Sequence, residues 1–167
     1  MPCVPDRRAR ARARRGPPCR TAGFSLIEIM VTVSIVAILA RIAIPAYQSY
    51  ALRGKVSQAF SQLSAWSIGM QQVYQDNRSY SGGSATACLA SGAGAAPTTN
   101  TGDFSYSCSN MGATTFTLSA TGKSGTSVYN YIYTIDQNGA RTTSTPTGAL
   151  FPSNGSCWVA SSNGACY

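Results

Sequence analysis

The most pronounced pattern in the chain is an apolar run near its N-terminus. From Phe24 to Ile44 there are 21 residues, of which only Glu28 and Arg41 are charged. At about 1.5 Å of rise per residue, a helix of this length spans a hydrocarbon core of roughly 30 Å. The run therefore predicts a membrane-spanning helix over residues 24–45, with one acidic residue near its start.

A second helical pattern follows Pro45, where we expect a kink or local melting because proline removes a backbone donor and clashes with the preceding turn. Apolar residues then advance by steps of three and four, the spacing of one helix face. We expect one long helix from about Phe24 to Tyr74, whose second half, within residues 46–78, is amphipathic. Its apolar face should pack on the rest of the chain and consists of Val56, Phe60, Leu63, Trp66, Met70 and Val73.

The second half of the chain changes from helical spacing to alternation. Residues 79–103 are rich in Gly, Ala, Ser and Thr and predict a loop. Asn138-Gly139 is a strong hairpin signal, and turn chemistry explains the neighbouring Asp136 better than a calcium site does. Residues 104–141 therefore predict an antiparallel sheet of three or four strands packed on the amphipathic half-helix, an α+β fold. Its alternating segments, typical of strands, are 104–108, 116–120 and 128–135.

Charge is concentrated before the apolar run. Residues 1–23 hold seven arginines and one aspartate, whereas the rest of the chain holds six basic and four acidic residues. Positive charge stays on the cytoplasmic side of a membrane, so the C-terminal portion should lie outside the cytoplasm. We interpret residues 1–23 as a basic leader that is removed. If they were retained, an arginine-rich arm that binds nucleic acid would be the alternative.

Four of the six cysteines follow the apolar run and would meet an oxidising compartment. They allow three pairings, of which we favour the two that are nearest in sequence, Cys88 with Cys108 and Cys157 with Cys166. The second bridge would bound a C-terminal region over residues 142–167, in which Trp158 packs against the sheet. Free buried thiols are the alternative, and a chain without histidine or a Cys-x-x-Cys pair does not favour zinc.

No catalytic constellation is evident. The chain has no histidine and no phosphate-binding loop, and any serine or cysteine nucleophile would lack a base. We therefore expect no enzyme, no catalytic residue, no cofactor and no metal site.

Gly23, Phe24, Glu28 and Pro45 together resemble the type IV pilin family, most closely the minor pilins of type IVa pili. The resemblance implies that a prepilin peptidase cuts after Gly23 and that a methyltransferase acts on the Phe24 amine. It implies that Glu28 meets the Phe24 amine of a neighbouring subunit and that Pro45 ends the half-helix embedded in the membrane. It also implies a disulfide-bounded C-terminal region.

The implied function is that of a structural subunit, taken as a minor pilin, that supports pilus biogenesis, twitching motility and adhesion. Its partners would be other pilin subunits, the prepilin peptidase and methyltransferase, the inner-membrane assembly machinery and the membrane. It would cross the inner membrane once, with its C-terminal domain in the periplasm, and join the extracellular pilus on assembly.

Two alternatives remain open. A type II secretion pseudopilin is disfavoured by the four exported cysteines and by the lack of a carboxylate-rich calcium loop. A minor pilin that binds DNA for uptake is disfavoured by a net charge of only +2 after residue 23 and by the lack of a basic stripe. Nucleic acid is therefore not a favoured partner.

Overall fold

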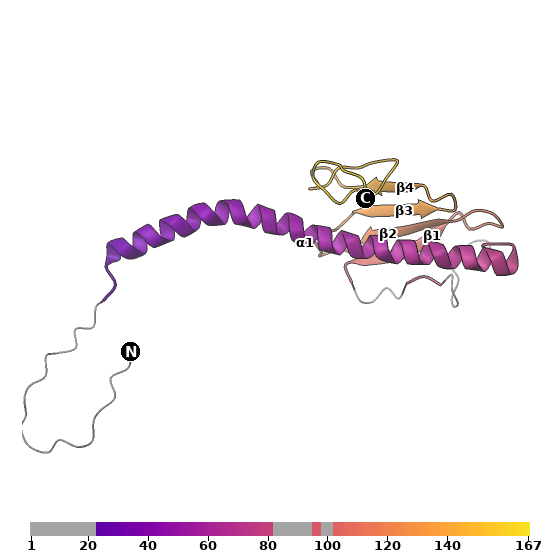
Figure 1. The fold of residues 1–167 in the computed structure, drawn as a ribbon, viewed down its shortest axis with the longest axis horizontal. Helices are drawn as coiled ribbons and strands as arrows, with labels where there is room; N and C mark the ends of the chain where they lie inside the picture. Colours follow the sequence, from indigo (N-terminus) through magenta and orange to yellow (C-terminus); the bar gives the residue numbers. More distant parts are fainter. Residues whose placement is uncertain (1–22, 82–94, 98–101) are drawn as a thin grey trace, which may run out of the picture. The chain divides into compact units, whose positions relative to one another are not determined.

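The computed structural model describes residues 23–81, 95–97 and 102–167. The boundary between two compact units, Met1–Leu39 and Ala40–Tyr167, falls after Leu39. One long helix runs through this boundary. The predicted α+β class is confirmed. The elements, shown in Figure 1, are α1 (Leu26–Asn77), β1 (Phe104–Ser109), β2 (Thr117–Gly122), β3 (Ile132–Asp136) and β4 (Arg141–Ser144).

Helix α1 begins after Ser25, whose carbonyl oxygen accepts hydrogen bonds from the backbone nitrogens of Glu28 at 3.1 Å and Ile29 at 3.3 Å. The helix continues through Pro45 without local melting, and the kink, the other form of that expectation, stays a prediction. Proline removes a single donor, and the turns on both sides keep their own hydrogen bonds. The helix ends at Asn77 because Arg78 adopts a positive φ of 55°, a left-handed conformation that stops a helix.

The second half of α1 buries one face against the sheet. The predicted face is confirmed from Val56 to Met70, while Val73 is only half-buried. Phe60 contacts both the sheet and the C-terminal region. Its ring meets that of Tyr133 in β3 edge-on, with centroids 4.9 Å apart, and stacks on that of Trp158 in the C-terminal region. The buried residues of α1 are Leu52, Val56, Ala59, Phe60, Leu63, Trp66, Ser67, Gly69 and Met70.

The four strands form one antiparallel sheet in the order β1-β2-β3-β4. In the two central strands the side chains alternate between the core and the opposite face. Leu118 pairs with Ile135 in the register and both are buried, whereas Thr134 on the other face is half-buried. This period-two pattern is what the sequence predicted for strands packed on a helix.

The turn between β3 and β4 is the predicted hairpin. The Asp136 carboxylate accepts hydrogen bonds from the backbone nitrogens of Asn138 at 2.9 Å and Ala140 at 2.8 Å. Gly139 has a φ of 75°, which a residue without a side chain adopts easily. The carboxylate therefore organises the turn, as expected, and the sheet extends to Ser144, beyond the expected end at residue 141.

The first residues of the predicted strand 128–135 form a turn instead of a strand. Tyr131 donates a backbone hydrogen bond to the carbonyl oxygen of Val128 at 3.0 Å, and Asn130 has a φ of 60°. This turn approaches Gly122 so closely that a Cβ there would lie 1.7 Å from the Val128 oxygen. Because of this tight backbone contact, which the alternation of side chains does not reveal, β3 begins only at Ile132.

The C-terminal region has little regular structure, as expected. An isolated bridge between Thr143 and Asn154 connects it to β4, and a second one between Val159 and Cys166 lies within the region. Cys157 and Cys166 form a disulfide bond, which confirms that predicted pair. Cys108 is also disulfide-bonded, but its predicted partner Cys88, with most of the predicted loop 79–103, lies outside the described residues.

Candidate functional site

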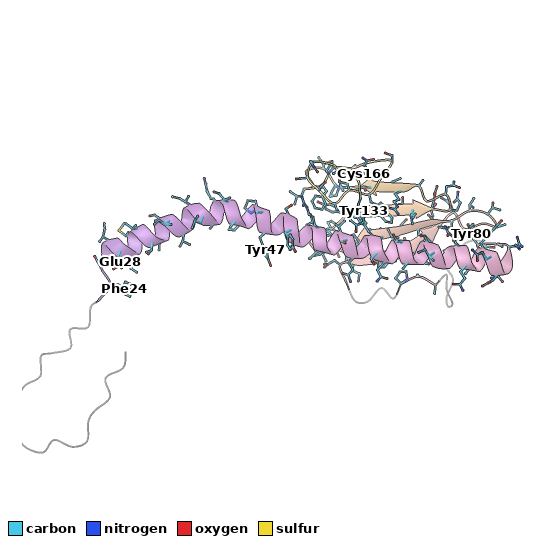
Figure 2. The ribbon with its side chains drawn as sticks, viewed as in Figure 1. Phe24, Glu28, Tyr47, Tyr80, Tyr133 and Cys166 are labelled. Atoms are coloured by element: carbon cyan, nitrogen blue, oxygen red, sulfur yellow. A yellow bond between two sulfur atoms is a disulfide. The ribbon has the colours of Figure 1, made fainter. Side chains whose placement is uncertain are left out.

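Phe24 and Glu28 lie at the N-terminal end of α1 (Figure 2). Both are exposed, Phe24 by 79%. The Glu28 carboxylate sits in the first helical turn, where a negative charge complements the positive end of the helix dipole. Among the described residues it has no hydrogen-bond or ion-pair partner. The carboxylate is therefore available to a cation from outside the helix.

The first half of α1 leaves its apolar side chains uncovered. A soluble monomer rarely exposes a contiguous apolar patch of more than a few hundred Å². This segment is also long and apolar enough to cross a membrane. Lipid or other protein chains must therefore cover these side chains, which are 50–79% exposed: Phe24, Leu26, Ile27, Ile29, Met30, Val31, Val33, Ile35, Val36, Ile38, Leu39, Ile42 and Ile44.

Two hydroxyl groups within this apolar run are satisfied by the helix itself. Thr32 Oγ1 donates to the carbonyl oxygen of Ile29 at 2.9 Å, and Ser34 Oγ donates to that of Met30 at 2.7 Å. A hydroxyl without a partner would be costly in a medium that lacks water. The polar groups of the run are thus compatible with a lipid or protein environment.

The disulfide region surrounds a buried tryptophan. Trp158 is 1% exposed and donates its Nε1 hydrogen bond to the carbonyl oxygen of Thr134 at 2.7 Å. Its ring stacks on Phe60 with centroids 4.8 Å apart, and the Arg141 guanidinium lies 4.4 Å from its centroid. The expected core role of Trp158 is confirmed. Because its side chain is covered, Trp158 makes no surface contact.

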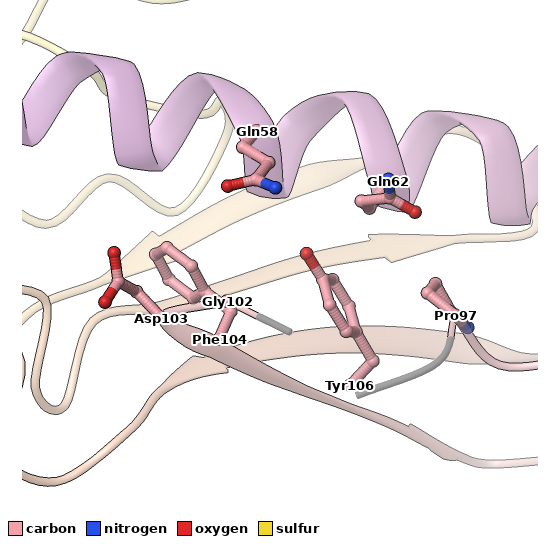
Figure 3. Close-up of a pocket in the computed structure, with 7 residues that line it drawn as sticks. All are labelled: Gln58, Gln62, Pro97, Gly102, Asp103, Phe104 and Tyr106. Carbon is pink, nitrogen blue, oxygen red and sulfur yellow. The ribbon is translucent and has the colours of Figure 1, made fainter. Parts of the chain in front are cut away.

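A small polar pocket lies between α1 and β1 (Figure 3). The side-chain amides of Gln58 and Gln62 extend from α1 toward Asp103 and Tyr106, around a cavity of about 110 Å³. Asp103 is engaged by Lys55, with Oδ2 and Nζ 3.1 Å apart. Burial raises the pKa of the Tyr106 phenol. The pocket offers hydrogen bonds, but it holds no nucleophile paired with a base, so it does not support catalysis.

Comparison with known proteins agrees with this arrangement. Residues 19–43 match the family model described as "Prokaryotic N-terminal methylation motif". Residues 45–145, more than half of the chain, match the model described as "Type IV minor pilin ComP, DNA uptake sequence receptor". The chain belongs to the type IV pilin family. Proteins of this family are structural subunits, and this pilin has an N-terminal helix that is long and apolar enough to cross a membrane.

Individual relatives are similar over the N-terminal part of the molecule. A "Fimbrial protein" of Moraxella nonliquefaciens is 42% identical over 65 residues, which are 39% of this chain and 42% of the relative. The "Fimbrial protein EcpC" of Eikenella corrodens is 38% identical over 68 residues, 41% of this chain and 44% of the relative. The "Type IV major fimbrial protein FimA" of Dichelobacter nodosus is 41% identical over 56 residues, which are 34% of this chain and 36% of the relative. The matched part of the pilin thus spans less than half the length of each relative.

The predicted site residues fall into two sets. Gly23, Phe24 and Glu28 lie together at the start of α1, and Pro45 follows 17 residues after Glu28 in the same helix. Cys108, Cys157 and Cys166 belong to the C-terminal half, and all three are disulfide-bonded. The sequence did not reveal that Thr143, buried in β4, anchors the disulfide region, because a threonine in a strand is an ordinary residue.

Proposed function

We propose that this chain is a minor pilin that enters a type IV pilus through the first half of α1. The observation that carries the proposal is the uncovered apolar helix with Glu28 as the one acidic residue in its first turn. The match to a family of minor pilins supports the minor role. Pilus biogenesis, twitching motility and adhesion are then the processes in which the subunit takes part.

Processing would create the assembly contact. Hydrolysis of the peptide bond after Gly23 would leave a free amine on Phe24, which methylation keeps cationic. The Glu28 carboxylate of a neighbouring subunit would pair with that amine inside the filament. Two opposite charges attract strongly where water is excluded, and the pair would favour one axial stagger over others.

The charges flanking the helix support one orientation. Seven arginines precede the apolar run, so residues 1–23 would stay in the cytoplasm and the chain beyond Pro45 would lie in the periplasm. The partners in this scheme are the prepilin peptidase and methyltransferase and the inner-membrane assembly machinery. After assembly the domain would face the outside of the fibre.

Intact mass and N-terminal sequencing of the protein from its own cells test the proposal. Membranes and sheared surface fibres are analysed separately. A chain that begins at methylated Phe24 and occurs in the fibres is the expected result. The same processed chain found only in membranes, even after overexpression, would favour a type II secretion pseudopilin. A chain that keeps residues 1–23 would contradict the proposal.

A second candidate function is DNA binding during uptake, which the description of the matching family favours. The charges give this candidate little support. In the described part of the chain, Lys55 pairs with Asp103, and Arg141 lies over the Trp158 ring. Arg41, Arg53 and Arg78 remain as exposed cations of the Ala40–Tyr167 domain that form no ion pair within its described residues. Few phosphate contacts predict a weak dependence of binding on salt.

Fluorescence anisotropy with labelled duplex DNA distinguishes the two roles. The full chain in detergent is titrated with duplexes of differing sequence at several salt concentrations. Binding to one duplex at least about a thousandfold tighter than to the others would establish a sequence receptor. Weak binding of similar strength to all duplexes would contradict the DNA-binding role and support the structural role only.

A further inference from the structure

Exposed aromatic and aliphatic side chains surround α1 where it enters the domain Ala40–Tyr167. Tyr47 and Tyr50 are 73% and 78% exposed on the helix itself. Tyr129, Leu150 and Tyr167 belong to the surrounding loops and are 52%, 43% and 66% exposed. We call these five residues the collar.

Two grooves flank the helix within the collar. Tyr50 and Tyr167 line one groove of about 500 Å³, together with Arg53. Tyr129 and Leu150 line the other, of about 460 Å³, and it reaches α1 at Gln48 and Leu52. At about 100° per residue, the two sets of helix residues lie on opposite sides of α1. The collar therefore encircles the helix.

The collar lies close to the end of the apolar run. Along the helix axis Tyr47 is about 4.5 Å and Tyr50 about 9 Å beyond Ile44. The headgroup layer of a bilayer is about 5–7 Å thick on each side of the hydrocarbon core. Tyr129 and Leu150 share a groove with helix residues of the same level. If the hydrocarbon core ends near Ile44, the collar meets the headgroups.

The chemistry of the collar fits this position. Tyrosine has an apolar ring and a polar hydroxyl, and it is enriched at membrane interfaces for that reason. Arg53 is the one charged residue that lines either groove, and it has no ion pair among the described residues. Arg41, also exposed, lies on the same helix before Ile44 and can extend its side chain to the interface. A surface with tyrosines, a cationic side chain and no acidic side chain suits anionic lipid.

We propose that the collar is a membrane-contact surface that seats the domain on a bilayer containing acidic phospholipid. The tyrosine rings lie among the headgroups, and Arg53 faces lipid phosphate. A second copy of the chain is the competing occupant, but the collar continues directly from the membrane anchor, and neither groove has an acidic side chain through which a second copy would pair with Arg53. The contact requires the membrane anchor only, so it holds whether or not the subunit later enters a filament.

Fluorescence quenching by brominated lipid tests the contact. Tyr129→Trp introduces a reporter into the collar, and the native Trp66 and Trp158 are only 3% and 1% exposed, so they contribute a constant background. The full chain is placed in nanodiscs at one copy per disc, with bromine near the glycerol end of the acyl chains. Emission from the new tryptophan should fall by about half, because an interfacial tryptophan sits at headgroup level.

Ile68→Trp is the matched control. Ile68 is 66% exposed on the same helix, but it lies about 36 Å along the axis beyond Ile44. Its emission should not change in brominated discs. Equal emission changes for both variants would overturn the proposal. So would a Tyr129→Trp signal that is unquenched in single-copy discs and shifts to the blue only when two copies share a disc, because that outcome assigns the collar to a second copy.

Arg53→Gln tests the preference for acidic lipid. The emission of the Tyr129→Trp variant should be quenched more in discs of phosphatidylglycerol than in discs of phosphatidylcholine, because a cation near the surface attracts anionic lipid. Adding Arg53→Gln should remove that difference. Quenching that is the same in both lipids before the change would contradict the role of Arg53. The discs contain no filament, so these results are independent of the test of pilus assembly.

Discussion

Thr143 donates a buried hydrogen bond from its hydroxyl to the carbonyl oxygen of Cys157 at 2.9 Å. The same hydroxyl accepts a hydrogen bond from the backbone nitrogen of Val159 at 3.0 Å. Thr143 is 3% exposed, so water does not compete for these groups. One hydroxyl in β4 therefore holds the backbone on both sides of Trp158 and attaches the disulfide region to the sheet.

Replacing Thr143 with valine keeps the shape of the side chain but leaves both backbone groups without their partner. We expect the free energy of unfolding to fall by about 2–3 kcal/mol, since each buried unsatisfied group costs about 1–3 kcal/mol. Urea unfolding of the full chain in detergent, followed by tryptophan emission, measures the change. Thr114→Val, at an exposed position, should shift the value by less than about 0.5 kcal/mol. Equal effects of the two changes would contradict the anchoring role.

Phe60→Ala should be more damaging. The ring is 1% exposed and contacts the rings of Tyr133, Trp158 and Tyr167. Truncating a buried phenylalanine costs about 3–5 kcal/mol. Ile68→Ala removes an exposed apolar side chain of the same helix and is the control. If thermal unfolding showed similar midpoints for the two variants, the helix would not be packed as described.

The disulfide between Cys157 and Cys166 closes a loop with a sequence separation of 9. Loop closure of this size stabilises a fold by about 2–3 kcal/mol through the unfolded chain. Replacing both cysteines with serine should lower the urea midpoint accordingly. Mild reduction of the unmodified chain should give the same shift, provided that mass spectrometry shows the other disulfide intact. An unchanged midpoint after the double replacement would refute the expectation.

Stability should decline at high pH through Tyr133. Burial, and then the neighbouring Tyr131, raises the pKa of Tyr133 above its ordinary value of 10.0. The folded state therefore favours the neutral phenol, and this stabilisation is complete below about pH 10 and decreases as the pH rises further. The decline should approach about 1.4 kcal/mol per pH unit for this one group.

Urea unfolding between pH 8 and pH 11 measures this dependence. Tyr133→Phe removes the phenol with the largest rise in pKa and should reduce the decline, leaving the smaller part due to Tyr80 and Tyr106, whose pKa burial also raises. It also removes the hydrogen bond from the phenol to the Val159 carbonyl, 3.2 Å long, at every pH. Tyr129→Phe, at an exposed position, is the control and should leave the decline as it is. A Tyr133→Phe profile parallel to the unmodified one would show that another group is responsible.

Glu28→Gln tests the assembly contact. A neutral amide cannot pair with a neighbouring amine as a carboxylate does, so incorporation into fibres should fall by about tenfold or more, equivalent to ~1.4 kcal/mol. The ratio of protein in sheared fibres to protein in membranes gives the readout. Asp76→Asn removes an exposed acid from the other end of α1 and should have no effect. Undiminished incorporation of the Glu28 variant would show that assembly does not require the Glu28 carboxylate.

Much of the fold could be predicted because its signals are local. The apolar run, the spacing from Val56 to Met70 and the Asn138-Gly139 turn each act over a few residues. The same holds for the start of α1, where Gly23, Phe24 and Glu28 lie within one stretch of six residues. The Cys157 and Cys166 pair was predictable because nearest closure happened to coincide with the fold.

The sequence by itself determined the long helix, the sheet behind it and the uncovered apolar segment, because hydrophobic periodicity and turn chemistry are properties of short stretches. Only the tertiary structure decided that β3 begins at Ile132, that Thr143 holds the disulfide region and that the collar tyrosines surround α1. These features depend on groups that are far apart in the chain and meet at short range. Their geometry follows from packing the whole domain, which no local pattern encodes.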